Sequence, residues 1–200
     1  MADTLDVVTL AEAREDLGDG GDSALMGQYI TRISRLLDKA CGPIVQRAVT
    51  AEVHDGGTYA IMLDEYPVVS VTSATEYQGT TAVTLTEEAV TSSPGSGFLV
   101  DFSTGRVWRR SGKRDWYFYP GRRNIIITYE AGRYANTASV DERFKAAALI
   151  ALRNLWGREQ GMGTVTFGPD GQPIVGATFA LPNAAAAFIR EDMRISGLAD

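Results

Sequence analysis

The sequence predicts an α+β protein in which helical regions stand on either side of a β-rich middle. At both ends of the chain, apolar residues recur every three or four positions, which is the period of a helix. Between residues 44 and 135 the apolar residues instead alternate or form short β-branched runs. We therefore predict a helical core from residues 1–43 and 136–162, an inserted antiparallel β domain from residues 44–135, and a C-terminal arm with a short helix from residues 163–200.

Two helices are predicted at the start of the chain. Thr9 and Glu12 have the spacing of a capping box, which opens a short helix that Gly18 ends. Asp22 or Ser23 then caps a second helix of about five turns. A Gly-Pro pair at 42–43 ends this helix. Its apolar residues share one face, which consists of Leu25, Tyr29, Ile33, Leu36, Leu37 and Ala40.

The middle of the chain is predicted to form a small antiparallel sheet or a partly closed barrel. Its β-branched runs are separated by turn residues, among them Asp-Gly-Gly at 55–57 and Ser-Thr-Gly at 103–105. Pro67 stands at the start of a strand, where its missing N–H group does little harm. The predicted strands are residues 49–53, 59–63, 68–77, 98–102, 106–108 and 124–130.

A long helix and a shorter one are predicted after the β domain. Ser139 and Glu142 repeat the capping-box spacing and open a helix that runs to about Gln160. Asn183 is placed to cap a last helix over residues 184–195. The long helix has an apolar stripe formed by Phe144, Ala148, Leu149, Leu152, Leu155 and Trp156.

The composition excludes several classes of protein. No stretch approaches the roughly 20 consecutive apolar residues that a membrane helix needs, so no membrane contact is expected. The first residues lack a basic region followed by an apolar one, so no signal peptide is expected. A single cysteine, Cys41, excludes an intrachain disulfide and fits a reducing compartment.

The residues that could support catalysis are few, and we predict that the protein is not an enzyme. His54 is the only histidine, and its neighbour Asp55 would point to the opposite face of a strand, so the two do not resemble part of a catalytic triad. Cys41 has no base placed to activate it. One histidine and one cysteine cannot supply a typical zinc site, and no phosphate-binding glycine motif occurs. No cofactor or metal is therefore predicted.

The most distinctive polar feature is a basic segment at residues 106–123. It holds seven basic residues and one acid, so it carries +6, while the chain has a net charge of −6 and the remainder therefore carries −12. Aromatic residues alternate with these charges. The predicted contact residues of this segment are Arg106, Arg109, Arg110, Lys113, Arg114, Trp116, Arg122 and Arg123.

Three interpretations of the basic segment remain open at this stage. It can bind an acidic partner protein, since Arg, Trp and Tyr are favoured at interfaces. It can be a plain β-hairpin with solvated arginines at its tip and aromatic residues packed on the sheet. It can also bind single-stranded nucleic acid through phosphates and stacked bases. A nucleic-acid-binding module is therefore the alternative function.

The order of these motifs resembles the head–tail connector (adaptor) proteins of long-tailed phages. The resemblance spans nearly the whole chain, and each motif alone has little specificity. It rests on VTLAEAREDLG at residues 8–18, the helix end at Cys41-Gly42, YPVVSVTS at 66–73, STGR at 103–106, YEAG at 129–132, the Trp156 helix and ALP at 180–182.

The resemblance implies a structural virion protein of the neck, made in the host cytoplasm, and implies no catalytic residues. Such adaptors form a ring of about twelve subunits beneath the portal protein, continue its DNA channel, and meet a stopper or tail-completion protein. DNA passes through the lumen without sequence-specific binding, and an acidic body suits that role because it does not hold phosphates. Segment 163–200 becomes the candidate portal-binding arm, with contacts at Val165, Phe167, Ile174, Val175, Phe179, Leu181, Phe188 and Ile189.

Overall fold

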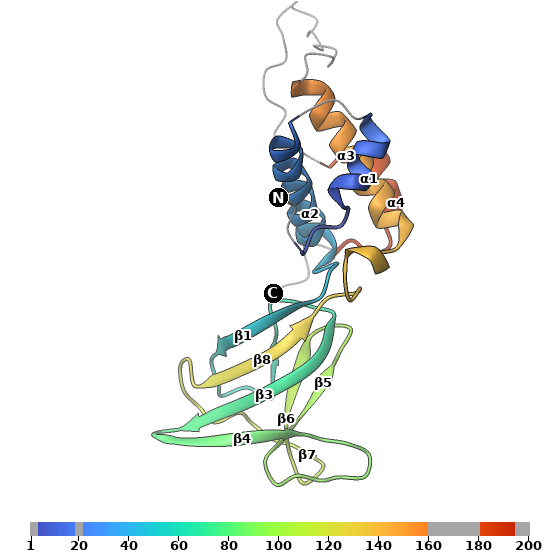
Figure 1. Ribbon diagram of the computed structural model, residues 1–200. Coiled ribbons are helices and arrows are strands. Elements are labelled where there is room, and N and C mark those ends of the chain that lie inside the picture. Colours follow the sequence, from blue (N-terminus) through green and yellow to red (C-terminus); the bar gives the residue numbers. More distant parts are fainter. Residues whose placement is uncertain (1–3, 19–21, 160–180, 195–200) are drawn as a thin grey trace, which may run out of the picture. The chain divides into compact units, whose positions relative to one another are not determined.

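The protein has an α+β fold that divides into two compact units. The structure, a computed structural model, describes residues 4–18, 22–159 and 181–194 (Figure 1). A helical unit comprises Met1–Val45 and Tyr134–Asp200, and a β unit comprises Gln46–Arg133. The predicted division into three segments stays a prediction, because most of residues 163–200 lie outside the described residues.

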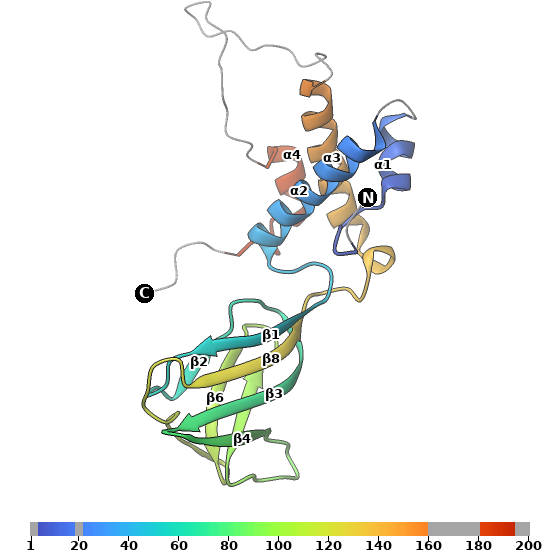
Figure 2. The same ribbon diagram turned by 60° about the vertical axis from the view of Figure 1, so that its left-hand side comes forward.

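The described part of the helical unit contains four α-helices, which pack around one apolar core (Figures 1 and 2). Tyr29 and Trp156 meet edge to face in this core, with ring centroids 6.1 Å apart. The last helix belongs to the same core, since Ala185 and Ile189 are fully buried. The helices are α1 (Leu10–Leu17), α2 (Ser23–Cys41), α3 (Glu142–Glu159) and α4 (Asn183–Ile189).

The first two helices begin where the sequence predicts. The Glu12 amide donates to Thr9 Oγ1 at 3.2 Å, and the Thr9 amide donates to Glu12 Oε2 at 2.7 Å, which completes the capping box. Asp22 is the cap of α2, since its Oδ1 accepts from the Ala24 amide at 2.8 Å. Gly42 follows α2 with a φ of +84°, a conformation that favours glycine.

The capping box predicted at Ser139 and Glu142 is wrong. Ser139 belongs to a separate turn of 3₁₀ helix, Thr137–Ser139, in which the Ser139 amide donates to Asn136 Oδ1 at 3.0 Å. Val140 is extended, so it separates this turn from α3. Asp141 caps α3 instead, because its Oδ1 accepts from the Arg143 amide at 2.9 Å.

The β unit is a mostly antiparallel sheet of eight strands (Figure 2). Its strand order is β1-β8-β3-β4-β5-β6-β2, with β7 paired to β6, and the β4–β5 pair is parallel. The strands are β1 (Arg47–His54), β2 (Ala60–Met62), β3 (Val68–Gln78), β4 (Thr81–Glu87), β5 (Gly97–Asp101), β6 (Arg106–Ser111), β7 (Arg114–Asp115) and β8 (Ile125–Ala131).

Most of these strands lie where strands are predicted, but β4 and β7 do not. The β3–β4 hairpin turns through two residues between Gln78 and Thr81, and Gly79 has a φ of +65° there. Most of β4 is exposed; its one buried side chain is Leu85. Its apolar signal is therefore weak in the sequence, and pairing with β3 determines its conformation.

The sheet curls so that strands far apart in its order share one core. Side chains of β2, β3, β4, β5, β6 and β8 all belong to a single buried cluster. Phe118, in the loop between β7 and β8, is fully buried in that cluster. A curled sheet with a filled interior matches the predicted partly closed barrel more closely than a flat sheet does.

An ion pair crosses the interior of the β unit. Arg109 of β6 is 3% exposed and Glu76 of β3 is 1% exposed, and Arg109 Nη2 lies 3.2 Å from Glu76 Oε2. Glu76 also accepts from the Tyr119 amide at 2.7 Å and from Gln78 Nε2 at 2.9 Å. Arg109 Nη1 donates to the Gly97 carbonyl at 3.1 Å. Both charges are thus compensated by several hydrogen bonds, as a buried pair requires.

Breaking this pair from one side should destabilise the protein strongly. Arg109→Met leaves the Glu76 carboxylate buried without its counter-ion, so we expect a loss of about 3–5 kcal/mol in the free energy of unfolding. The double variant Arg109→Met/Glu76→Met should recover much of this loss, since neither charge remains. Urea unfolding followed by circular dichroism measures both. The control Arg122→Met, at an exposed arginine, should stay within about 0.5 kcal/mol. Equal losses in the single and double variants would contradict this view of the pair.

The pair should also make stability depend on pH. Burial opposes the charged form of Glu76, but the hydrogen bonds from Arg109, the Tyr119 amide and Gln78 outweigh it and hold the pKa of Glu76 below its ordinary value. The carboxylate therefore stabilises the folded state above its unfolded pKa of about 4.3, and this contribution is lost as the pH falls through the folded pKa. The difference in stability between wild type and Glu76→Gln should narrow below about pH 4.5. Unfolding curves between pH 3 and 7 measure it, and Glu87→Gln, at an exposed carboxylate of β4, is the matched control. A difference that does not change with pH would contradict the assignment.

Candidate interaction surfaces

The structure divides the basic segment at residues 106–123 into interior and surface cations. Arg109 is interior, so it leaves the set of predicted contact residues. Arg110 is half-buried, and its Nε lies 2.8 Å from Glu88 Oε2 while its Nη1 binds Asp115. The hydrogen bond to Glu88, aided by that to Asp115, raises the pKa of Arg110 against the effect of burial. Two of the seven basic residues are therefore neutralised within the β unit.

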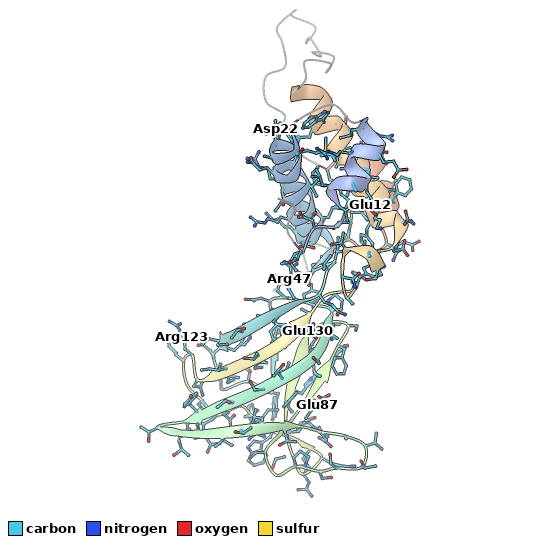
Figure 3. All side chains as sticks on the ribbon, viewed as in Figure 1. Glu12, Asp22, Arg47, Glu87, Arg123 and Glu130 are labelled. Atoms are coloured by element: carbon cyan, nitrogen blue, oxygen red, sulfur yellow. The ribbon has the colours of Figure 1, made fainter. Side chains whose placement is uncertain are left out.

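Five cations of the segment remain on the surface. Within the part of the chain that the structure describes, none of them has a carboxylate partner. Lys113 donates to the Val90 carbonyl at 2.7 Å, and Arg106 lies over the Trp108 ring with its Cζ 5.4 Å from the centroid. The five are Arg106, Lys113, Arg114, Arg122 and Arg123, the last of which is labelled in Figure 3.

The loop from residue 116 to residue 124 is held in place from inside the sheet. Phe118 anchors it as a buried knob, and the Phe118 amide donates to the Thr58 carbonyl at 2.9 Å. The Tyr119 amide donates to the buried Glu76 carboxylate. The Asn124 side chain donates to the Tyr119 carbonyl at 2.7 Å. This loop therefore presents its side chains from a fixed backbone.

Gly56 allows the chain before β2 to approach this loop closely. Its amide donates to the Gly121 carbonyl at 2.9 Å and to Asn124 Oδ1 at 2.9 Å. A Cβ at position 56 would lie 2.0 Å from the Tyr119 carbonyl oxygen, so no larger residue fits there. The Asp-Gly-Gly motif at residues 55–57 therefore places a glycine where the backbone contact leaves no room for a side chain.

Four aromatic side chains on and beside this loop are exposed. Tyr59 and Tyr117 stack with ring centroids 3.6 Å apart, and each is about half exposed. Trp116 is 57% exposed and Tyr119 is 45% exposed. The plain-hairpin interpretation expects aromatic residues packed on the sheet; Phe118 is buried and Trp108 is half-buried, whereas Trp116, Tyr117 and Tyr119 are exposed. The surface is thus both aromatic and cationic, which is a composition typical of interfaces.

The predicted portal contacts fall in two groups. Val165, Phe167, Ile174, Val175 and Phe179 lie outside the described residues. Among the others, Phe188 is 49% exposed, Leu181 packs partly against the helical core, and Ile189 is fully buried in it. In the chain by itself Ile189 is therefore a core residue and not a surface contact.

His54 belongs to a hydrogen-bond cluster that the sequence analysis did not find. Its Nε2 lies 2.6 Å from Glu52 Oε1, and that carboxylate also accepts from the Tyr129 hydroxyl and, at 3.0 Å, from the Asp64 amide. Burial opposes ionisation of Glu52, but these hydrogen bonds hold its pKa below the ordinary value. Burial, together with the bond to Glu52, raises the pKa of Tyr129. The hydrogen bonds of Glu52 connect β1 to β8 and to the loop after β2. In the sequence, the cluster was indicated only by Glu52 and His54, which are two residues apart and therefore share one face of a strand.

The described residues offer little else for chemistry. They contain no group of three or more His, Cys, Asp or Glu side chains placed to hold a metal ion. Cys41 is buried at the end of α2. A hollow of about 320 Å³ lies between α1 and α3, where Lys145 Nζ binds Glu12 Oε1 at 2.6 Å. Among the helices described, none combines the length and the apolar character needed to cross a membrane.

Comparison with solved structures shows that this fold occurs elsewhere. One similar chain belongs to the neck of an empty gene transfer agent (GTA) particle with C6 symmetry, with a TM-score of 0.58 and 16% identity over 97% of this chain and 93% of that chain. Another belongs to the virion of a native GTA particle, with a TM-score of 0.57 and 16% identity over the same shares. No family model matches the sequence, and no curated protein does. The chain therefore shares its fold, along nearly its full length, with chains of phage-like particles.

Proposed function

We propose that this protein is a structural subunit in the neck of a phage-like particle. The observation that carries the proposal is the similarity to the GTA neck chain over 97% of this chain and 93% of that one. Because the match covers nearly all of both chains, it includes the helical unit and the β unit and is not limited to one of them. At 16% identity it is a likeness of fold, and the function rests on further support.

Two further observations support a structural role. The motif order of the sequence resembles that of head–tail adaptors, and this resemblance does not depend on the fold comparison. The most developed surface of the β unit also has the aromatic and cationic composition of a contact surface. A subunit that works by fitting between neighbours needs such surfaces.

Within this proposal the protein is the head–tail adaptor. About twelve copies form a ring beneath the portal protein, continue its DNA channel and meet a stopper or tail-completion protein on the other side. DNA passes through the lumen without being held, which agrees with a net charge of −6. Segment 163–200 attaches the ring to the portal, and the site of action is the virion neck.

Electron microscopy of the purified chain, alone and mixed with the portal protein of its particle, tests this function. We expect a closed ring of about twelve copies seated on the portal, because a symmetric template favours ring closure. Replacing Val165, Phe167, Ile174, Val175 and Phe179 together by serine should abolish attachment, because these apolar side chains are the proposed portal contacts.

This substitution is a sharper test than deleting residues 163–200. The deletion would remove α4, whose Ala185 and Ile189 are part of the helical core, and would destabilise that unit. The matched control is Val53→Ser, at an exposed residue of β1 outside the arm, and an unchanged circular dichroism spectrum shows that each variant is folded. A folded serine variant that still binds the portal would contradict the arm assignment, and absence of any ring on the portal would contradict the adaptor role.

The alternative function, a nucleic-acid-binding module, draws on the same exposed cations and aromatic residues. Fluorescence anisotropy with a labelled single-stranded DNA of about 20 nucleotides tests it, since binding to phosphates must weaken with salt. For an adaptor we expect no binding tighter than the nonspecific range, about 10⁻⁴ to 10⁻⁶ M. Tight, salt-dependent binding that Arg114→Glu/Arg122→Glu/Arg123→Glu abolishes and Arg32→Glu/Arg35→Glu leaves intact would favour the module instead.

A further inference from the structure

The β unit leaves part of one strand edge unpaired. β4 pairs with β3 along residues 81–85, but on its other side it meets β5 only at Thr86 and Glu87. Figure 1 shows β4 at the margin of the sheet beside β3. Residues 81–85 therefore have an open edge, although β4 stands in the middle of the strand order. We call this stretch the open β4 edge.

The backbone groups that face this edge can be identified from the contact with β5. The Thr86 amide donates to the Ser96 carbonyl at 3.1 Å, on the β5 side. Along an antiparallel strand, the N–H and C=O groups of successive residues point to alternate neighbours. Ala82 and Thr84 therefore direct these groups to the same side as Thr86. Within the described residues, neither the N–H nor the C=O group of these two residues has a hydrogen-bond partner there.

The two strands at the ends of the sheet order carry features that prevent strand addition, and β4 does not. β1 has a bulge between Val49 and Glu52, within which Ala51 has a φ of +54°. β2, at the other end, has three residues. Residues 81–85 of β4 contain no charge or proline, and their pairing with β3 has no bulge. Charges, prolines, bulges and short length are the usual protections of an edge, so the open β4 edge is unprotected.

The side chains along the open β4 edge are neutral on both faces of the sheet. Leu85 is buried in the core of the β unit, and Val83 packs against that core. Ala82 and Thr84 are exposed on the opposite face. A strand added here would place alternate side chains beside Val83 and Leu85, where apolar residues pack best.

The same edge of a second copy does not fit this site. Around a twofold axis, an antiparallel pair that bonds all of these groups must place Ala82 opposite Thr84 of the other copy. In that register Thr80 of the other copy lies opposite Thr86, whose outward amide already donates to Ser96. β5 therefore obstructs the pairing of two identical edges. A single extended segment carries no hairpin with it and fits within residues 81–85.

We propose that the open β4 edge is a strand-addition site, at which an extended segment of a partner protein pairs with Ala82 and Thr84. Only an extended backbone offers N–H and C=O groups at the spacing that these two residues leave unpaired, so the edge itself specifies the occupant. The segment has an apolar residue at every second position and no proline among its pairing residues. The proposal goes beyond the neck function and does not depend on it.

Amide hydrogen exchange of the full chain, followed by NMR, tests the proposal residue by residue. The probe is a capped peptide of about seven residues that alternates valine and threonine between terminal lysines. In the free chain we expect fast exchange at the Ala82 and Thr84 amides and slow exchange at the Val83 amide, which points to β3. The peptide should slow exchange at Ala82 and Thr84 at least about tenfold and leave Val83 unchanged.

Proline and alanine at one position separate the role of the backbone from that of the side chain. Thr84→Pro removes the outward N–H group without breaking a bond to β3, so the peptide affinity in fluorescence anisotropy should fall at least about tenfold. The matched control Thr84→Ala keeps this group and should change the affinity less than about threefold. Ala82→Pro is a second proline variant with the same expected loss, and circular dichroism shows which variants are folded.

Four results would overturn the proposal. They are the absence of peptide binding at about 1 mM, equal affinities of the folded proline and alanine variants, and either of two patterns of exchange without peptide. Protection of Ala82 and Thr84 that grows with protein concentration would assign the edge to a second copy. Protection already complete in the dilute free chain would assign it to another part of this chain.

Discussion

The buried ion pair between Arg109 and Glu76 is the constraint on which the rest of the β unit depends. It joins β6 to β3 across the interior, although these strands are separated by two others in the sheet. A pair of charges with 3% and 1% exposure is stable only when every hydrogen-bonding atom finds a partner. Glu76 meets that need partly with the Tyr119 amide, so the same carboxylate that joins β3 to β6 also fixes the surface loop. The interior of the β unit and its exposed loop at residues 116–124 are therefore joined by hydrogen bonds.

Ion pairs within the β unit reduce the number of cations that the basic segment at residues 106–123 presents to solvent. Arg109 and Arg110 form ion pairs within the β unit, and the other five cations of residues 106–123 are exposed, as are Trp116, Tyr117 and Tyr119. Such a surface recognises by shape and charge and needs no reactive group. In the cluster around Glu52, likewise, the polar groups serve structure, since the bond from the Tyr129 hydroxyl to Glu52 joins β8 to β1.

The helical unit places a second constraint on function. Its core includes residues from both sides of segment 160–180, since Trp156 of α3 and Ile189 of α4 belong to the same cluster. The candidate portal-binding arm of residues 163–200 therefore includes a helix, α4, that is part of the helical core.

The sequence by itself determined the local features of this protein. Both N-terminal helices and their caps, the stripe of α3 and most strands follow from side-chain periodicity and turn chemistry, which depend on residues close together in the chain. The cap of α3 was predicted at Ser139, but Ser139 belongs to the separate 3₁₀ turn that Asn136 caps, and Asp141 caps α3. β4 was missed because it is mostly exposed and owes its conformation to β3.

Only the tertiary structure decided which charges are interior and which side chains share a face. Nothing near Arg109 in the chain distinguishes it from Arg114, because its partner Glu76 lies 33 residues away. The row that Leu99, Trp108 and Ala60 form across the sheet likewise depends on the registers of three strands, which are long-range contacts. Local physics thus fixed the elements of this chain, and packing between distant segments fixed its surfaces.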